Sequence, residues 1–587
     1  MGNSDMATLE GELPRHHEAT RSEILVITAS SLGTVFEWYD FFLYGLLTSI
    51  IASQFLTGLN PTTSFIMALL VFAAGFIVRP FGALVFGRIG DLVGRRYTFI
   101  VTLLVMGLST FLVGCLPTYN TAGVAAPIML VVLRLFQGLA LGGEYGGAAT
   151  YVAEHAPNNR RGLYTSWIQL TATAGLALAL LIVIVTRSTA MGVGEDAFRA
   201  WGWRIPYLIS GVFLAIGLWL RLKLHESPVF EKMKADGTGS KAPISEAFGK
   251  WKNLKIVFVA FFGAIAGEAV VFYAGHLYSL FFLEKLLKLD GLTANLLIMA
   301  GLLLGAPFYL FFGWLSDHIG RKPILMTGCA LAALTMFPVF HALTEAANPA
   351  LARAQATAPV SVIAAPAECS SQFDPVGQNK FDTTSCDIVK NLLAKAGVNY
   401  TNVAAPPGTI ASIAIGSEKL IAPDPRKLVG GDRKKAIADF AAKVIGKPAE
   451  LAREAGAGIP AQMATPAVAG ELARVGYPSK ADPVAINKPL VVALIFYLVL
   501  LVTMVYGPLA ATLVELFPSR IRYTSMSLPY HIANGWLGGL LPAIGFAMVA
   551  ANGDIYHGFW YPVIVSASTF VLGLLFLPET YRRNIDA

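Results

Sequence analysis

Long apolar runs separated by short polar segments dominate this chain of 587 residues. A helix needs about 20 apolar residues to cross a bilayer, and several runs are longer, which indicates tilt or breaks at Gly and Pro. The pattern predicts an all-α membrane protein with twelve transmembrane helices in two pseudo-symmetric six-helix halves. The predicted spans lie near residues 24–55, 63–89, 97–117, 126–153, 163–187, 203–224, 255–284, 293–316, 322–344, 488–515, 524–551 and 557–579.

One ten-residue pattern occurs twice, at residues 87–96 and 313–322, and each copy joins two apolar runs. In both copies an Asp stands three residues before a Gly-Arg-basic triplet. This spacing allows the carboxylate to pair with an Arg at i+4 and to stabilise a neighbouring helix N-terminus. The pattern resembles the gate loop of major facilitator transporters, which implies that it controls access and does not bind solute. The predicted gate residues are Gly87, Asp91, Gly94, Arg95, Arg96, Gly313, Asp317, Gly320, Arg321 and Lys322.

Composition agrees with a membrane protein, because 55% of the residues are hydrophobic, 14% are charged and the mean hydropathy is +0.60. Lys and Arg gather in alternate short loops and in segment 221–255. Cytoplasmic loops retain positive charge, so we expect these loops and both termini to be cytoplasmic. This bias accounts for the net charge of +7, and nucleic acid is not an expected partner. Residues 1–22 contain no apolar core of a removable signal peptide.

The segment 345–487 interrupts the pattern, since it is polar and rich in Ala, Pro and Gly. Helix counting places it outside the cytoplasm as a small cap, with helical spacing at 381–398 and 432–445. If the host is a bacterium that compartment is oxidising, which favours a disulfide between Cys369 and Cys386 over two free thiols. The expected organisation is an N-terminal tail 1–22, a first half 23–224, a connector 225–254, helices seven to nine at 255–344, the insertion 345–487, helices ten to twelve at 488–579 and a tail 580–587.

Further motifs make the resemblance more specific. Residues 34–41, 79–82, 134–138 and 142–147 are similar to those of the metabolite:proton symporters, the bacterial transporters for citrate, α-ketoglutarate, shikimate, proline and betaine. The resemblance covers nearly all of the chain except 345–487. It implies an inner-membrane carrier that takes up a small organic solute with a proton, at a site between two rocking halves. The chain lacks the long C-terminal heptad tail of the betaine/proline branch, so osmotic sensing by such a tail is not expected.

Ionisable residues inside the predicted spans are the candidates for chemistry, because each costs roughly 2.5–3.5 kcal/mol at the bilayer centre. Two readings stay open: the carboxylates carry the proton and the arginines bind a substrate carboxylate, or Glu37 or Asp40 is a fixed partner of Arg79 in a helix clamp. For His276 the alternative is a position facing an outer vestibule. The proton-coupling candidates are Glu37, Asp40, Glu144 and Glu268, and the substrate-binding candidates are Arg79, Arg134, Gln137, Tyr145, Tyr273 and His276.

Other classes of function have less support. The sequence contains no metal-ligand cluster, nucleophile motif or cofactor loop, and no Walker-type nucleotide loop, so we predict neither an enzyme nor an ATP-driven pump, and no cofactor. The leading prediction is a proton-coupled importer of a small carboxylate or zwitterion, a monomer in the bacterial inner membrane. The alternative is a solute-sensing receptor that keeps the carrier fold and signals through the insertion.

Overall fold

The computed structural model describes residues 21–56, 71–72, 74–188, 192–223, 226, 228–370, 381–396, 398–446, 470–581, 583 and 585. Nearly all of the predicted N-terminal tail 1–22 lies outside the described residues, as do residues 57–70 of the predicted second span and its preceding loop.

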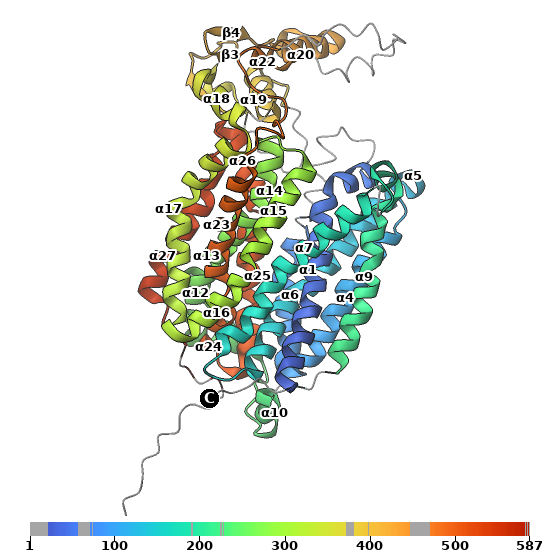
Figure 1. Ribbon diagram of the computed structural model, residues 1–587, viewed down its shortest axis with the longest axis vertical. Coiled ribbons are helices and arrows are strands. Elements are labelled where there is room, and N and C mark those ends of the chain that lie inside the picture. Colours follow the sequence, from blue (N-terminus) through green and yellow to red (C-terminus); the bar gives the residue numbers. More distant parts are fainter. Residues whose placement is uncertain are drawn as a thin grey trace, which may run out of the picture.

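Two helical bundles stand side by side, one for each half of the chain (Figure 1). Long helices of the first half alternate with short turns at the loops, and residues 71–72 and 74–77 lead helically into α3. The elements of this half are α1 (Arg21–Phe55), α3 (Arg79–Leu92), α4 (Arg95–Cys115), α5 (Tyr119–Ala122), α6 (Ala125–His155), α7 (Arg161–Arg187), α8 (Glu195–Ala197), the π-turn η1 (Phe198–Gly202) and α9 (Arg204–Leu222).

The second half contains several π-helical turns, which widen a helix locally and are frequent at functional sites. Its seventh span is assembled from α12 (Trp251–Ala260), η2 (Phe261–Ile265), α13 (Ala266–Tyr273), η3 (Ala274–Tyr278), α14 (Ser279–Phe281) and η4 (Phe282–Leu286). The remaining elements are α15 (Gly291–Gly305), α16 (Pro307–Ile319), α17 (Arg321–Ala347), α23 (Lys488–Tyr506), α24 (Leu509–Leu516), η7 (Ser519–Ile521), α25 (Arg522–Ile532), η8 (Ala533–Gly538), α26 (Leu541–Asn552), η9 (His557–Phe559) and α27 (Trp560–Phe576).

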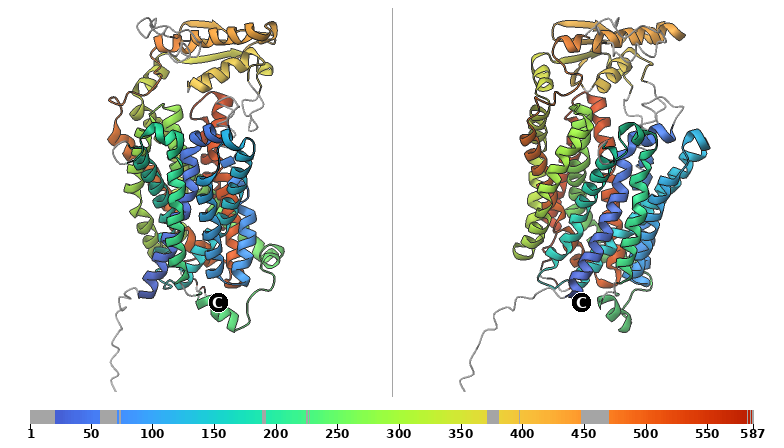
Figure 2. Two further views of the ribbon diagram at one scale, coloured as in Figure 1. Left: turned by 90° about the vertical axis from the view of Figure 1, so that its right-hand side faces the viewer. Right: turned by 45° about the vertical axis from the view of Figure 1, so that its right-hand side comes forward.

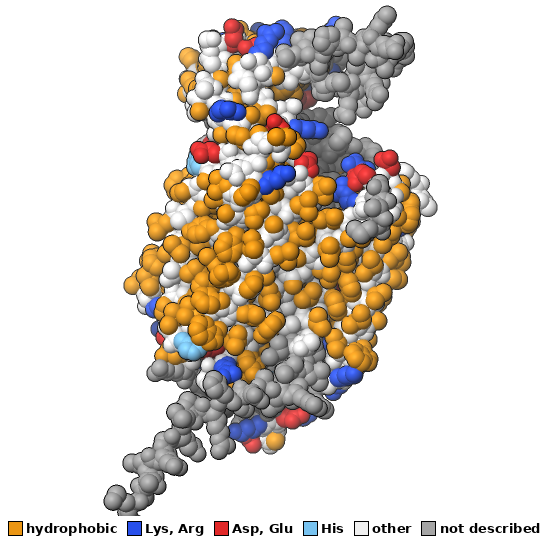
Figure 3. All heavy atoms as spheres, in the orientation of Figure 1, with side chains coloured by type: hydrophobic (Ala, Val, Ile, Leu, Met, Phe, Trp, Pro, Cys, Tyr) orange, Lys and Arg blue, Asp and Glu red, His pale blue; other side chains and the backbone are white. Residues whose placement is uncertain are grey.

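The sides of the bundle are apolar. Ten helical stretches of the described residues are long and apolar enough to cross a membrane, and the predicted first two spans correspond to α1 and to the helix that ends at Leu92. Large apolar side chains such as Leu334 and Leu575 are exposed on these helices. Figure 3 shows hydrophobic side chains as a broad band over the visible face of the bundle, with charged side chains gathered toward its two ends. The chain is therefore a multi-pass membrane protein.

The insertion adds a mixed four-stranded sheet, in the order β2-β1-β3-β4, to the otherwise mostly helical chain. Strand β1 pairs in parallel with β2 and antiparallel with β3, and β3 and β4 form a hairpin. The elements of this cap are α18 (Pro349–Thr357), β1 (Val360–Ala364), η5 (Pro366–Glu368), α19 (Ser385–Ala396), β2 (Tyr400–Ala404), β3 (Ser412–Ile415), β4 (Glu418–Ile421), η6 (Pro425–Lys427), α20 (Gly430–Ile445) and α22 (Glu471–Arg474).

The cap lies at one end of the bundle, and the connector helices α10 (Pro228–Ala235) and α11 (Pro243–Gly249) belong to the other end (Figures 1 and 2). In the described residues, the hydrogen bonds that join cap and bundle end on the second half. Tyr400 N donates to Gly553 O at 3.0 Å, Asn402 Nδ2 donates to Asn552 O at 2.5 Å and Lys288 Nζ donates to Pro478 O at 2.9 Å. Among the described residues, the cap is thus hydrogen-bonded to the second half.

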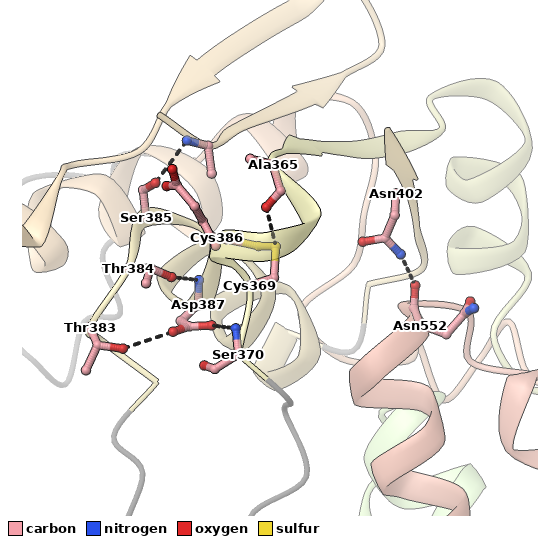
Figure 4. Close-up of a disulfide and its surroundings, with 12 residues drawn as sticks. Ala365, Cys369, Ser370, Thr383, Thr384, Ser385, Cys386, Asp387, Asn402 and Asn552 are labelled. Atoms are coloured by element: carbon pink, nitrogen blue, oxygen red, sulfur yellow. Dashed lines mark hydrogen bonds between the residues drawn. A yellow bond between two sulfur atoms is a disulfide. The ribbon is translucent and has the colours of Figure 1, made fainter. Parts of the chain in front are cut away.

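Cys369 and Cys386 form a disulfide inside the cap, the pairing that the sequence favoured. Figure 4 shows the bond at the start of α19. Beside it the Asp387 carboxylate accepts hydrogen bonds from Ser370 N at 2.9 Å and from the Thr383 hydroxyl at 3.0 Å. These contacts fix the N-terminal end of α19 against the segment that follows β1.

Candidate transport site and gates

The first gate loop joins the two halves through Asp91. Its Oδ1 lies 3.3 Å from Arg95 Nη1, and its Oδ2 accepts a hydrogen bond from Thr524 N at 2.9 Å, in the first turn of α25. Arg95 also donates from Nη2 to Ser519 O at 3.0 Å. One carboxylate therefore pairs at i+4 within its own loop and stabilises the N-terminus of a helix in the other half.

The second gate loop makes the same contacts in the opposite direction. Asp317 Oδ1 lies 2.6 Å from Arg321 Nη1, and the two carboxylate oxygens accept from Gly162 N and Leu163 N, each at 2.8 Å, at the start of α7. Both loops turn at a glycine with positive φ, Gly94 at 146° and Gly320 at 103°, a conformation that residues with a side chain rarely adopt. The repeat in sequence is thus a repeat in structure.

Acidic residues also stabilise the helices that follow the two turns. Glu226 accepts from Arg95 N at 3.1 Å and from Arg96 N at 3.3 Å. Glu579 accepts from Arg321 N and Lys322 N, both at 3.0 Å. Gly87 and Gly313 are needed for close packing, since an added Cβ would lie 3.1 Å from Thr524 Cα and 2.5 Å from Ser166 Cβ, respectively.

Two reciprocal ion pairs complete this closed end. Arg161 of the first half lies 3.0 Å from Glu515 of the second, and Arg522 of the second lies 2.8 Å from Glu154 of the first. Arg321 Nη2 also lies 3.0 Å from Glu515. These side chains are buried, and buried pairs are costly to break because a lone charge remains. The end of the bundle that carries the gate loops is therefore held shut.

Glu37 and Glu144 belong to a cluster inside the first half. Arg221 Nη1 lies 2.9 Å from Glu37 Oε1, and its Nη2 lies 2.6 Å from Glu144 Oε1. Glu144 also accepts from the Thr34 hydroxyl at 3.1 Å and the Thr102 hydroxyl at 3.0 Å. The prediction of a clamp between Glu37 and Arg79 is wrong, because Glu37 uses a different arginine.

Arg79 and Arg134 lie apart from these carboxylates, against aromatic rings. The guanidinium carbon of Arg79 is 4.3 Å from the Phe41 ring centroid and 4.5 Å from that of Phe76, while that of Arg134 is 4.4 Å from Tyr44. Both arginines are buried, and neither forms an ion pair with a carboxylate of the described residues. Nε and Nη2 of each have no hydrogen-bond partner there. Arg79 Nη1 reaches Tyr273 Oη of the other half at 3.5 Å.

A chain of polar groups runs from Arg134 toward Asp40. Arg134 Nη1 donates to Gln137 Oε1 at 2.7 Å, and Gln137 Nε2 donates to the Thr110 hydroxyl at 2.8 Å. Thr110 neighbours the buried Asp40 carboxyl, whose Oδ1 has no partner among the described residues. The predicted clamp between Asp40 and Arg79 is therefore also wrong.

The remaining candidates meet where the halves touch. Gln169 of α7 donates to Tyr145 Oη and to Tyr506 O, both at 2.9 Å, and the Tyr145 ring stacks on Tyr530 with centroids 3.6 Å apart. His276 Nε2 lies 3.1 Å from the Thr173 hydroxyl. His276 is buried and contacts a residue of the other half. It therefore does not face an outer vestibule, which was the alternative position.

Glu268 stands separately in the second half, where its Oε2 accepts from Asn534 Nδ2 at 2.9 Å. The candidate carboxylates and guanidiniums thus form several separate groups in the structure. Sequence reasoning missed the role of Arg221, which it counted among the basic charges of segment 221–255. It also missed His531, whose buried ring nitrogens have no partner in the described residues. The position of Arg221 inside the sixth apolar run was the available signal.

The comparisons with known proteins agree with this architecture. The family model described as Major Facilitator Superfamily matches residues 30–364. The chain belongs to this superfamily. Its relatives include the alpha-ketoglutarate permease of Escherichia coli (strain K12), which is 35% identical over 56% of this chain and 74% of the permease. The shikimate transporter of the same organism is 35% identical over 54% of this chain and 71% of that protein.

A third relative, the proline/betaine transporter of Escherichia coli (strain K12), is 35% identical over 54% of this chain, and the match spans 63% of that protein, less than two thirds of its length. These relatives are transporters, not enzymes, and they are the group that the motifs predicted. Among solved structures, the proton:xylose symporter XylE is similar with a TM-score of 0.59 and 14% identity, over 96% of this chain and 98% of that one. This likeness concerns the major facilitator fold alone.

Proposed function

We propose that this major facilitator transporter imports a small organic carboxylate or zwitterion together with a proton. The observation that carries the proposal is the state of Arg79 and Arg134, which are buried guanidiniums with unused donors and no carboxylate partner among the described residues. A buried donor without a partner costs about 1–3 kcal/mol, and more when it is charged. An anionic substrate offsets that cost when it binds.

The chemistry of the arginines favours a carboxylate over a sugar. A guanidinium presents a planar fork of donors that matches a carboxylate in two parallel hydrogen bonds. The aromatic rings of Phe41, Phe76 and Tyr44 pack against the guanidiniums of Arg79 and Arg134 and hold them in place. Tyr273, a residue of the second half, accepts a hydrogen bond from Arg79. A solute bound here touches both halves, which alternating access requires.

Proton coupling is assigned to the buried carboxyls, and foremost to Asp40. A carboxyl that exchanges a dry surrounding for a hydrated one changes its affinity for protons. The chain from Arg134 through Gln137 to Thr110 connects the proposed anion site to Asp40, so that loading of one site affects the other. Glu268 and the pair Glu37 and Glu144 remain further proton-coupling candidates.

The charge distribution supports one orientation in the membrane. The gate loops and the basic connector belong to the end opposite the cap, and positive residues favour the cytoplasm. We assign that end, and both termini, to the cytoplasm and the cap to the periplasm of a bacterial inner membrane. The transporter then stands closed toward the cytoplasm.

A competition experiment tests the substrate class. Purified protein in liposomes is given a radiolabelled dicarboxylate, and its uptake is challenged with monocarboxylates, tricarboxylates, betaines, proline and xylose. Competition by carboxylates or zwitterions and none by xylose is the expected result. Inhibition by xylose alone contradicts the proposal. Binding of a carboxylate without any flux supports the receptor alternative.

A further inference from the structure

Tyr523 of α25 crosses from the second half into a slot in the first half. An added Cβ would lie 2.1 Å from the Tyr523 ring at Gly90, 3.0 Å at Gly146 and 2.5 Å from its hydroxyl at Gly147. The slot therefore exists because these three residues of α3 and α6 are glycines. The ring is fully buried, and its hydroxyl donates to Gly143 O.

The slot ends at the acidic cluster of the first half. Gly143 directly precedes Glu144, whose carboxylate shares Arg221 with Glu37. Charged groups near the Tyr523 hydroxyl include Glu144 and Glu37 of the cluster, and Asp91 and Arg95 of the gate loop. Tyr523 thus lies near both the cluster and the gate loop.

The charge balance of the cluster formed by Glu37, Glu144 and Arg221 favours the binding of one proton. Two carboxylates face one guanidinium, so full ionisation leaves one uncompensated negative charge in a buried place, which is costly. Glu37 Oε2 is buried and has no hydrogen-bond partner among the described residues. A proton on this oxygen neutralises the surplus charge without breaking either contact to Arg221.

We propose that Tyr523 is the plug that seals this proton site from the cytoplasm while the gate is closed. The inference rests on the proposed proton-coupled transport. The plug belongs to the same helix start that Asp91 holds through Thr524 N. When the halves part at the gate, Tyr523 leaves its slot, water reaches Glu144 and Glu37 between the glycines, and the proton passes from Glu37 to that water.

Proton flux in liposomes tests the plug. Tyr523→Ala and the bulkier Tyr523→Leu should each admit protons severalfold faster than the wild type in the absence of solute, as reported by an internal pH dye, and should lower solute accumulation. Tyr523→Phe keeps the ring and should stay nearly tight. Tyr497→Leu is the matched control, because Tyr497 is a half-buried tyrosine whose hydroxyl lies 3.0 Å from that of Thr335, away from the cluster.

The route of the leak is tested by a second substitution. Adding Glu37→Gln to Tyr523→Leu should close the leak, because the proton site itself is lost. A monodisperse elution profile and an unchanged helical circular-dichroism spectrum of each purified variant show that the protein is folded. A tight Tyr523→Leu variant with normal accumulation overturns the plug, and so does a leak that persists after Glu37→Gln. Failure of the wild type to move protons with solute instead overturns the proposed function.

Discussion

Arg79 and Arg134 approach the same aromatic ring, with their guanidinium carbons 4.3 and 5.5 Å from the centroid of Phe41. Two like charges are thus brought together in a buried place without a carboxylate partner among the described residues. Such an arrangement is unfavourable by itself, and an anion between or beside the two guanidiniums relieves it. The empty donors and the shared ring are the structural basis for assigning a carboxylate as substrate.

Replacement of Arg79 or Arg134 by lysine keeps the positive charge but removes the planar pair of N–H donors that can bind both oxygens of a carboxylate. Arg79→Lys and Arg134→Lys should each raise the KM for carboxylate uptake about 10- to 100-fold, because a charge-assisted hydrogen bond contributes roughly 1.5–3 kcal/mol. Uptake kinetics in liposomes measure the effect. Arg199→Lys is the control, since Arg199 pairs with Glu195 at a side-chain exposure of 68%. An unchanged KM in both central variants contradicts the substrate site.

Neutralisation of Asp40 should separate transport from coupling. Asp40→Asn removes the proton-binding oxygen but keeps the shape, so accumulation against a gradient should be lost while exchange of solute across the membrane is partly retained. Paired uptake and exchange assays measure the two activities. Asp439→Asn, at an exposed position of α20, should change neither. Full accumulation by Asp40→Asn in energised vesicles excludes Asp40 as the proton carrier.

Glu515 is expected to decide how firmly the gate closes. Glu515→Gln leaves Arg161 and Arg321 without the carboxylate that both contact at 3.0 Å, and breaking a buried pair costs about 3–5 kcal/mol. The population should move toward the state open at the gate. Spin labels at the exposed Asn159 and His318 report the distance between the halves there. Glu195→Gln serves as the control, and an unchanged distance in Glu515→Gln contradicts the assignment.

The disulfide should stabilise the cap without being required for transport. Closing a short loop of this size contributes about 3 kcal/mol in the chain-entropy account, so Cys369→Ser with Cys386→Ser should speed hydrogen exchange in α19. Uptake should stay within about twofold of the wild type, since losing that term unfolds the cap only locally. Cys115→Ser with Cys329→Ser changes the two free cysteines instead. Equal exchange in both double variants contradicts the role of the bond.

Lys288 gives the cap attachment a dependence on pH. Burial lowers the pKa of Lys288 to about 8, below the ordinary value of about 10.4. Between about pH 8 and about 10.4, Lys288 is therefore more often protonated when the cap is undocked than when it is docked. The docked state becomes more stable as pH rises through this range. Protease cleavage between 470 and 487 should slow from pH 7.5 to 9.5 in the wild type and change less in Lys288→Met. Faster cleavage at high pH contradicts this sign.

Apolar run lengths were enough to find the membrane helices. The span predicted at 126–153 is α6, Ala125–His155, and that at 322–344 is α17, Arg321–Ala347. The repeat also predicted that Asp91 pairs with Arg95 and that Asp317 pairs with Arg321. Such a contact between residues i and i+4 is local in the chain. The length and the apolar composition of a run depend only on residues that are neighbours in the chain, so a single sequence contains this information.

The contacts of Arg221 could not be read in the same way. Its place depends on Gly33, where an added Cβ would lie 2.7 Å from the guanidinium, and on carboxylates from two other helices. The strands of the cap were missed for a related reason, since β1 and β2 are short and pair across a helix. Tertiary packing decides such features, and a single sequence carries little trace of it.

Simultaneous recording of solute and proton entry tests the central claim most directly. Liposomes that contain the purified protein and an internal pH dye receive a carboxylate competitor identified in the uptake panel, under an inward proton gradient. The account predicts accumulation above the external concentration together with internal acidification, both reduced in Asp40→Asn. The account is contradicted if solute accumulation is the same with and without the proton gradient, or if solute enters without internal acidification.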